Sequence, residues 1–362
     1  MMEEWKTENP PALTFDKFIR TARLLSPMKN FELDEQEIEF RKHPLLDYWC
    51  RINLGRSLRV KQAHAPSDYD DTIQEVIKRT REKCFFCPEN LETTTPKFPP
   101  DITPEGRLRK GKFVLLPNLF PFAEHHAVGI LSEDHFLGLN EITKELLEDC
   151  FTVSIDYFRR VYELNNEMKF CSINMNYMMP AGASIVHPHV QITSDTKGSI
   201  KLLEILHKSK EYHDAHNTNY WMDLVETEQW LKERYIGNSG AVSFLANWAP
   251  IGKNEVLGIL KRPISHFRAF DETLISDFSE GLSKIFTGLW EKRHIRSLNL
   301  TIYSGPIDVD LSDYFRVHVK MISRPILRPY YTSDTAFMEN FYAEPIIETA
   351  PEDVASDLRS NW

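Results

Sequence analysis

The sequence lacks the charge balance of a protein that binds polyanions. Its 43 Lys and Arg residues are outnumbered by 53 Asp and Glu residues, which gives a formal net charge of −10. An acidic chain has no general electrostatic attraction for nucleic acid or for an anionic membrane. We therefore expect neither as a partner, and any anionic ligand must be bound by local positive charge.

Long hydrophobic runs are also missing. The longest uncharged stretch, residues 170–194, has the length of a membrane span, but it contains asparagine, histidine, proline and glutamine residues that a bilayer would not accept. The first residues, Met-Met-Glu-Glu-Trp, have neither the basic flank nor the apolar run of a secretory signal. These absences predict a cytoplasmic protein.

Cysteine is scarce, with five residues in a chain of 362. Two of them, Cys84 and Cys87, form a Cys-x-x-Cys pair, which in a reducing compartment indicates metal binding or redox chemistry rather than a structural disulfide. Because no second Cys-x-x-Cys pair follows, the other ligands of a metal would be histidine or carboxylate. The histidine candidates are His125, His126, His135 and His187.

The composition, 42% hydrophobic and 27% charged, is that of a folded globular protein, and the sequence contains an internal repeat. The segment from Asn118 to Leu131 aligns with the segment from Asn247 to Leu260, at an offset of 129 residues. His189-Val-Gln aligns with His318-Val-Lys at the same offset. Two separate segments that share one offset indicate a duplication.

Each half of the duplication has the same predicted order of elements: strand, loop, strand, long helix, and two further strands. Hydrophobic periodicity predicts the helices at 142–162 and 274–289, and a helical connection at 201–235. The predicted strands are 113–116, 127–131, 171–177 and 188–193 in the first half and 242–246, 256–260, 298–303 and 315–322 in the second. We predict an α+β protein of two similar halves, each an antiparallel sheet with a long helix, packed into one unit.

The string His187-Pro-His189-Val-Gln191 carries the strongest chemical signal. In a strand, alternate side chains share a face, so that the two imidazoles and the amide lie on one surface. Upstream, Gly182 and Ser184 belong to a run of small residues whose backbone N–H groups can approach a phosphate. This combination predicts a phosphate-directed active site.

These residues resemble the motif series of the galactose-1-phosphate uridylyltransferase family, a branch of the histidine triad superfamily. The similarity covers about residues 41–195, and His-Pro-His-x-Gln is its most specific part. The tandem repeat agrees with the two histidine-triad-like halves of that family. The resemblance implies an N-terminal extension (1–40), a first half with the active site and the metal site (41–200), a second half (201–330) and a C-terminal segment near the sugar site (331–362).

The resemblance implies a nucleotidyltransferase that moves a nucleoside monophosphate between a nucleoside diphosphate sugar and a sugar 1-phosphate. His189 would be the nucleophile and would form a nucleotidyl-histidine, and Gln191 and Ser184 would hydrogen-bond the phosphoryl oxygens. Further substrate contacts are implied for Asn118, Phe120, Asn176 and Gly182. Arg56 and Arg59 would neutralise the diphosphate, and because the family's arginines cross a dimer interface, a homodimer is implied.

The same resemblance implies a metal site and a difference in the second half. Cys84, Cys87, His135 and His187 match the family's Cys₂His₂ zinc ligands, a closed set that would serve a structural role. In the second half only His318 remains of the three histidines that form the family's second metal site, so no second metal is expected.

The C-terminal segment departs from the family pattern where that family contacts its hexose. Ala336 stands in place of a lysine, and Glu339 adds a carboxylate, so the sugar is not fixed by the resemblance. Three alternatives remain open. They are a phosphorylase or hydrolase that uses the same intermediate, a nucleotide-binding module without turnover, and a redox role for the Cys-x-x-Cys pair.

Overall fold

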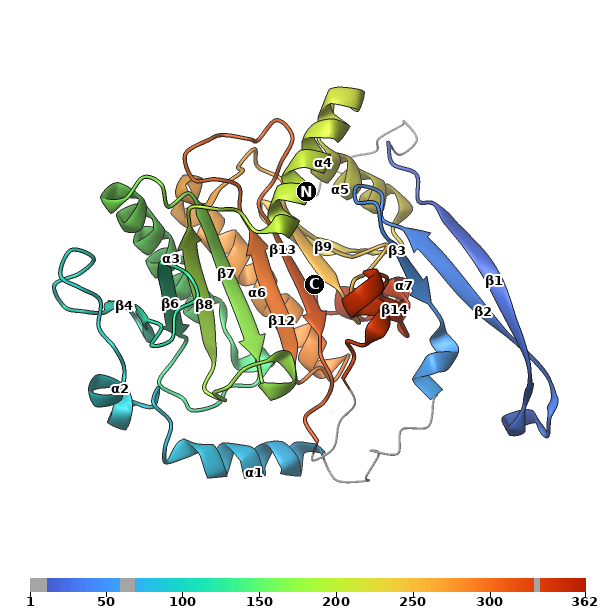
Figure 1. Ribbon diagram of the computed structural model, residues 1–362, viewed down its shortest axis with the longest axis horizontal. Helices are drawn as coiled ribbons and strands as arrows, with labels where there is room; N and C mark the ends of the chain where they lie inside the picture. The colour runs from blue at the N-terminus through green and yellow to red at the C-terminus, as the bar shows by residue number, and fades with distance from the viewer. Residues whose placement is uncertain (1–11, 59–68, 329–332) are drawn as a thin grey trace.

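The computed structural model describes residues 12–58, 69–328 and 333–362, which form a ten-stranded sheet, a four-stranded sheet and surrounding helices (Figure 1). The large sheet has the order β4-β5-β6-β8-β7-β12-β13-β11-β10-β9, and all its neighbouring strands are antiparallel. Its strands are β4 (Leu108–Lys110), β5 (Phe113–Pro117), β6 (His125–Ile130), β7 (Phe170–Tyr177), β8 (His189–Asp195), β9 (Tyr235–Ser239), β10 (Val242–Ala246), β11 (Val256–Leu260), β12 (Leu298–Tyr303) and β13 (His318–Ser323).

The two halves of the duplication meet at one strand pair. β7 ends the first half of the sheet and pairs with β12 of the second half, with Asn174 opposite Thr301. The Thr301 hydroxyl donates a hydrogen bond of 2.7 Å to the Asn174 side-chain oxygen at this junction. The predicted fold class is confirmed, and the two predicted sheets are joined edge to edge into one.

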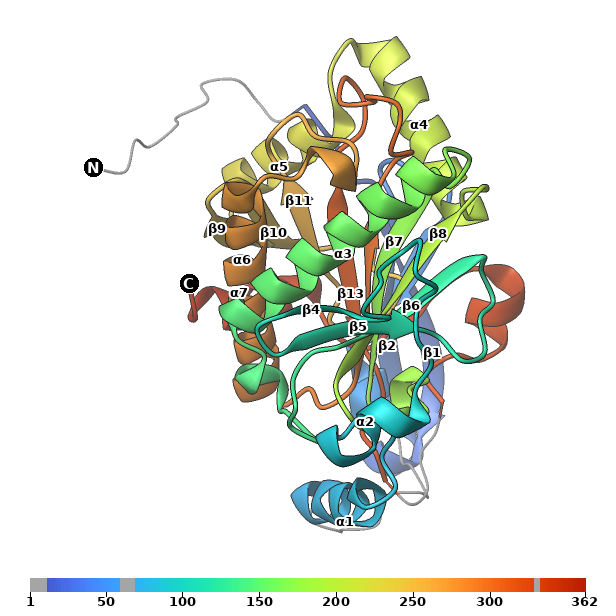
Figure 2. The ribbon, with the colours of Figure 1, turned by 90° about the vertical axis from the view of Figure 1, so that its left-hand side faces the viewer.

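Two long helices, α3 (Lys144–Leu164) and α6 (Glu272–Glu291), pack side by side on one face of the large sheet (Figure 2). Both begin where a side chain caps the first turn: Thr143 accepts from the Leu146 N–H, and Asp271 accepts from the Leu274 N–H. Strand alternation supplies the apolar surface beneath them. In β7 the side chains of Cys171, Ile173, Met175 and Tyr177 are buried, while Ser172, Asn174 and Asn176 face the other way.

The opposite face of the sheet is covered at both ends and not in the middle. Over the first half, the segment Cys84–Leu91, which includes the start of α2 (Pro88–Thr94), packs on apolar residues of β5 and β6. Over the second half, α4 (Ile200–His216) and α5 (Tyr220–Leu231) cover β10 and β11. The polar side chains of β7 and β12 lie between these two covers.

A small four-stranded sheet is formed outside the duplicated unit by the N-terminal and C-terminal segments. The hairpin of β1 (Lys17–Ser26) and β2 (Glu32–Lys42) continues into β3 (Trp49–Ile52), which pairs in parallel with β14 (Ile346–Ile347) from the C-terminal segment. The other elements are α1 (Tyr69–Arg81), α7 (Pro351–Arg359), η1 (Pro27–Lys29), η2 (Leu54–Leu58), η3 (Leu139–Glu141), η4 (Met179–Ala181), η5 (Phe267–Ala269) and η6 (Met338–Tyr342). In the described ranges, no helix has both the length and the apolar character needed to cross a membrane.

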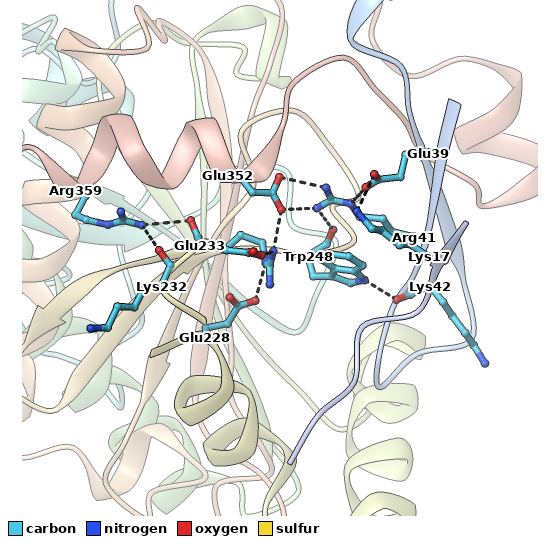
Figure 3. Close-up of polar contacts among 11 residues, drawn as sticks. Lys17, Glu39, Arg41, Lys42, Glu228, Lys232, Glu233, Trp248, Glu352 and Arg359 are labelled. Atoms are coloured by element: carbon cyan, nitrogen blue, oxygen red, sulfur yellow. Dashed lines mark hydrogen bonds and ion pairs between the residues drawn. The ribbon is translucent and has the colours of Figure 1, made fainter. Parts of the chain in front are cut away.

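A cluster of buried ion pairs fixes the N-terminal and C-terminal segments to the second half (Figure 3). Glu352 of α7 accepts from Arg41 of β2 at 2.9 Å and from Arg234 at 2.9 Å, and Arg234 also donates to Glu228 of α5 at 2.9 Å. The Trp248 ring lies 4.2 Å from the Arg41 guanidinium and 4.8 Å from that of Arg234. Burial raises the pKa of Glu228 to about 7 although Arg234 opposes the shift.

Arg234→Met is expected to lower the free energy of unfolding by about 3–5 kcal/mol, because it leaves the buried Glu228 carboxylate without its cation. Urea unfolding measures this change. The double variant Glu228→Gln/Arg234→Met removes both charges and should recover most of the loss. Lys210→Met breaks an exposed ion pair with Asp214 and should leave the urea midpoint almost unchanged, because solvent screens that pair. A double variant no more stable than Arg234→Met would contradict this account.

Candidate functional site

Four buried side chains from distant parts of the sequence meet at one point beside β8. Cys84 and Cys87 lie between α1 and α2, His135 follows β6, and His187 precedes β8. Their ligand atoms all lie within 4.8 Å of one another. Cys87 Sγ is 3.4 Å from His135 Nδ1 and 3.7 Å from His187 Nδ1, and Cys84 Sγ is 3.7 Å from His187 Nδ1.

These distances fit a tetrahedral metal ion. Zinc bonds of about 2.3 Å to sulfur and about 2.0–2.1 Å to nitrogen place neighbouring ligand atoms roughly 3.3–3.8 Å apart. The far nitrogen of each ring is held by a second contact: His187 Nε2 donates to the Ser132 carbonyl at 2.8 Å, and His135 Nε2 lies 2.9 Å from the Thr80 hydroxyl. Both rings therefore turn Nδ1 toward the cysteines, the usual arrangement of metal-binding histidines.

The protonation of these groups follows from their burial. Burial lowers the pKa of His187 to about 4 and, together with the neighbouring Cys84, raises the pKa of Cys87 to about 12. His187 is therefore neutral, as a ligand must be, and a bound cation would have to displace the thiol protons. The group could hold a metal ion.

His189 opens β8, two residues beyond His187 and on the same face of the strand as Gln191. Its Nδ1 lies 2.8 Å from the His187 carbonyl oxygen. Because a carbonyl can only accept, Nδ1 carries the proton of the neutral ring, and Nε2 keeps a free lone pair. Burial lowers the pKa of His189, which favours the neutral ring. The ring of Phe86, from the Cys-x-x-Cys segment, lies 5.5 Å away, edge toward face. The metal-binding group and the neutral imidazole thus share one short stretch of chain.

The loop before β8 has the backbone geometry of a tight turn. Gly182 ends η4 in the left-handed region at φ +93°, and Met178 begins the turn at φ +69° and ψ 160°, a region that residues other than glycine rarely adopt. Strained backbone of this kind concentrates at functional sites. Ser184 is exposed in this loop. Asn176, at the end of β7, accepts from Asn299 at 2.7 Å.

Asn118 and Phe120 lie in the loop between β5 and β6. The Asn118 side chain contacts His126 at 3.2 Å and accepts from the Phe120 N–H at 2.9 Å, and Phe120 itself is 83% exposed.

Arg56 lies in η2, directly after β3, and η2 is on the far side of β12 and β13 from β8 (Figure 1). Arg59 is outside the described residues.

A cavity of about 390 Å³ lies over the middle of the sheet, where neither cover reaches. We call it the central groove. Sequence reasoning had singled out two of its residues, Asn176 and Gln191. The others are Phe122, Asn174, Ile251, Asn299, Leu300, Thr301, Tyr303, Lys320 and Ile322. The alternation of polar residues in the predicted strands 171–177 and 298–303 could have identified Asn174, Asn299 and Thr301 as members of a polar face. It could not have shown that the two strands pair.

The second half holds a histidine at the position equivalent to His189. His318 Nδ1 lies 2.9 Å from the Arg316 carbonyl, as His189 Nδ1 does from the His187 carbonyl. The Trp221 ring of α5 stacks on His318 with 3.9 Å between ring centroids, and the ring is fully buried. His318 is therefore closed to a substrate.

No protein-family profile matches the chain. Among curated proteins, the chain is 26% identical to an uncharacterized protein of Archaeoglobus fulgidus, over 97% of this chain and 99% of that protein. It is 22% identical to the galactose-1-phosphate uridylyltransferase of Saccharomyces cerevisiae, over 90% of this chain and 96% of that enzyme.

Solved structures share the fold at low identity. An ADP-glucose phosphorylase from Arabidopsis thaliana with bound ADP-glucose superposes with a TM-score of 0.67 at 20% identity, covering 89% of this chain and 98% of that one. A galactose-1-phosphate uridylyltransferase-like protein from the same plant gives 0.66 at 19% identity, covering 88% and 98%. In sequence the chain is thus similar to galactose-1-phosphate uridylyltransferases over most of its length, and it shares its fold with galactose-1-phosphate uridylyltransferase-like proteins.

Proposed function

We propose that the protein is an enzyme that transfers a nucleoside monophosphate from a nucleoside diphosphate sugar to a sugar 1-phosphate through a nucleotidyl-His189 intermediate. The observation that carries the proposal is the neutral His189 ring, held through Nδ1 with Nε2 available beside the loop that contains Gly182 and Ser184. Homology to nucleotidyl-transferring enzymes supports the same class of reaction.

In the first step, His189 Nε2 attacks the α-phosphorus, a P–N bond forms, and the P–O bond to the sugar 1-phosphate breaks. The sugar 1-phosphate leaves with the electron pair as a weakly basic phosphate ester, so little proton donation is needed. In the second step, a phosphate oxygen of the acceptor attacks phosphorus and the P–N bond breaks. This returns neutral His189. Gln191 and Ser184 would hydrogen-bond the phosphoryl oxygens, and Asn118, Phe120, Asn176 and Gly182 would complete the substrate contacts.

Intact-protein mass spectrometry after brief incubation with UDP-, ADP-, GDP- and CDP-glucose is expected to detect an acid-labile nucleotidyl adduct. His189→Asn should abolish the adduct, because an amide can replace the Nδ1 hydrogen bond but not the nucleophile. The matched control, His318→Asn, changes the equivalent histidine of the second half and should leave the adduct intact. An adduct on folded His189→Asn, or none on wild type with any donor, would contradict the proposal.

The isolated adduct also decides the acceptor. We expect a sugar 1-phosphate to discharge it with formation of a nucleoside diphosphate sugar, and water to discharge it slowly. Discharge by inorganic phosphate to a nucleoside diphosphate, with no response to sugar 1-phosphates, would make the enzyme a phosphorylase instead.

We also propose that Cys84, Cys87, His135 and His187 bind one structural Zn²⁺. All four positions are used by protein ligands, so none is open to substrate. When bound, the ion would hold the Cys-x-x-Cys segment against the start of β8 and so fix the backbone that positions His189. The ion takes no part in the transfer itself.

Elemental analysis is expected to find one zinc per chain, and a strong chelator should lower the melting temperature because binding energy of the metal is folding energy. Cys87→Ser should lose the zinc, whereas Cys50→Ala, a change at a buried cysteine of β3 that is not part of the Cys₂His₂ group, should retain it. Metal-free wild-type protein that forms a reversible Cys84–Cys87 disulfide would instead support the redox alternative.

We propose further that the active enzyme is a cytoplasmic homodimer in which Arg56 and Arg59 approach His189 of the other subunit. Within one chain, η2 lies on the other side of β12 and β13 from β8, and this placement supports contact in trans (Figure 1). Sedimentation should give the mass of a dimer. Mixing inactive Arg56→Ala chains with inactive His189→Asn chains should restore activity, since each mixed dimer has one complete site. Mixed dimers that stay inactive would exclude this arrangement.

A further inference from the structure

The second half of the chain holds the η4 turn (residues 178–184), which belongs to the connection from β7 to β8 and leads to His189. Asn299 of β12 lies directly opposite Asn176 of β7. Its side-chain Nδ2 donates two hydrogen bonds of 2.7 Å, one to the Asn176 side-chain oxygen and one to the Ala181 carbonyl. One amide of the second half thus ties both the end of β7 and the η4 turn to β12.

The η4 turn needs this support because its first residue is strained. Met178 has φ +69° and ψ 160°, a conformation that glycine adopts far more readily than methionine. Its side chain is only 2% exposed, so that packing in the core fixes this end of the turn. The bond from Asn299 to the Ala181 carbonyl holds the other end. Loss of that bond would let the turn relax, and Gly182 and Ser184 would move with it.

Arg324 determines which way the Asn299 amide points. Its guanidinium donates to Asn299 Oδ1 at 2.8 Å, and a guanidinium has no acceptor. The oxygen of Asn299 therefore faces Arg324, and its nitrogen faces Asn176 and Ala181. Asp334 holds Arg324 in turn, through bonds of 3.0 Å from Nε and 2.7 Å from Nη2, and both side chains are largely buried.

The same bonds orient Asn176. Because Asn176 Oδ1 accepts from Asn299, its Nδ2 is turned to the other side, and it lies 3.8 Å from the point where a Cβ atom on Gly182 would stand. Asp334, Arg324, Asn299 and Asn176 thus form a series in which each group sets the direction of the next. The series ends in amide N–H donors beside the η4 turn, and such donors suit the oxygens of a phosphoryl group.

We infer that Asn299 is a positioning residue for nucleotidyl transfer at His189. It acts through Asn176 and through the η4 turn, and Arg324 fixes its direction. This inference rests on the proposed function, because it assigns these groups to the phosphoryl site of His189. The half of the chain whose histidine is covered thereby holds the phosphate-binding turn of the half whose histidine reacts.

Asn299→Asp tests the inference with a change of one group. A carboxylate still accepts from Arg324, but it can donate to neither Ala181 nor Asn176, and it draws the Asn176 amide nitrogen away from the η4 turn. Rates of adduct formation at saturating UDP-, ADP-, GDP- or CDP-glucose are measured by mass spectrometry. With the donor that reacts fastest with wild type, Asn299→Asp should react about 10- to 100-fold more slowly, since a misplacement of about 1 Å can cost that much. Asn299→Leu removes the same donors without adding charge and should also be slow.

The chain offers a matched control at Asn254. Its Oδ1 accepts from Arg293 at 2.9 Å, its Nδ2 donates to Ser323 at 2.8 Å, and Arg293 donates to Asp357 at 2.7 Å. This second Asp-Arg-Asn series connects the loop between β10 and β11 to β13 and α7, rather than to the η4 turn. Asn254→Asp therefore makes the same change in the same kind of network, and it should leave the rate of adduct formation close to that of wild type.

Rescue at Arg324 separates a positioning role from a structural one. Arg324→Met frees the Asn299 amide to turn over and should slow adduct formation, whereas Arg324→Lys can still donate to Asn299 Oδ1 and should restore most of the rate. Melting curves confirm that each variant is folded. A folded Asn299→Asp that reacts as fast as wild type, or an Asn254→Asp that is equally slow, would overturn the inference. If Asn299→Asp does not fold, equal rates of the two Arg324 variants would overturn it.

The proposed function can fail separately. If wild type forms no adduct with any donor, that proposal is wrong, and calorimetry with inorganic pyrophosphate tests the η4 turn without turnover. Weaker binding of pyrophosphate by Asn299→Asp than by wild type and Asn254→Asp would support the role of Asn299. Equal binding by all three, or no binding by wild type, would overturn it.

Discussion

The antiparallel pairing of β7 with β12 is the contact on which the rest of the molecule depends. It joins two duplicated units into one sheet and places Asn174 against Thr301 at the centre. Because both long helices lie on the same face, the other face of the central strands carries polar side chains without a helix above them. A surface of this kind has to be solvated or occupied by a ligand, since buried polar groups need partners. The central groove is therefore a direct consequence of the way the halves are joined.

The two halves kept the same strand geometry and diverged in what covers it. His189 and His318 occupy equivalent positions and make the same backbone hydrogen bond. In the first half the cover is the short Cys84–Leu91 segment, whose Phe86 ring contacts His189 edge-on, and Gln191 on the same face of β8 lines the groove. In the second half it is α5, whose Trp221 stacks on His318. The rings of Tyr303 and Phe315 also contact His318, which is fully buried, whereas His189 is 7% exposed.

Stability and chemistry are assigned to different parts of the chain. The ion pairs of Arg41, Arg234 and Glu352 tie the N-terminal hairpin and α7 to the second half, on the other side of that half from the metal-binding group. The first half relies instead on the four buried donor atoms beside β8. Loss of the ion pairs would loosen the second half, and loss of the metal-binding group would loosen the first half. Only the metal-binding group lies next to His189 in the sequence.

The sequence by itself determined the duplication, the long helices and most strands of the large sheet, because periodicity and a constant offset can be read along the chain. Spacing alone identified the Cys-x-x-Cys pair and left four histidines as candidate ligands; the choice of His135 and His187 came from the resemblance to a known family. The division of the chain at residues 40, 200 and 330 and the roles of the site residues stay predictions. The pairing of β7 with β12, the stacking of Trp221 on His318 and the hydrogen bond from Asn299 to Asn176 were decided only by the tertiary structure. Each joins residues of different strands or helices through packing and register, which no pattern along one segment encodes.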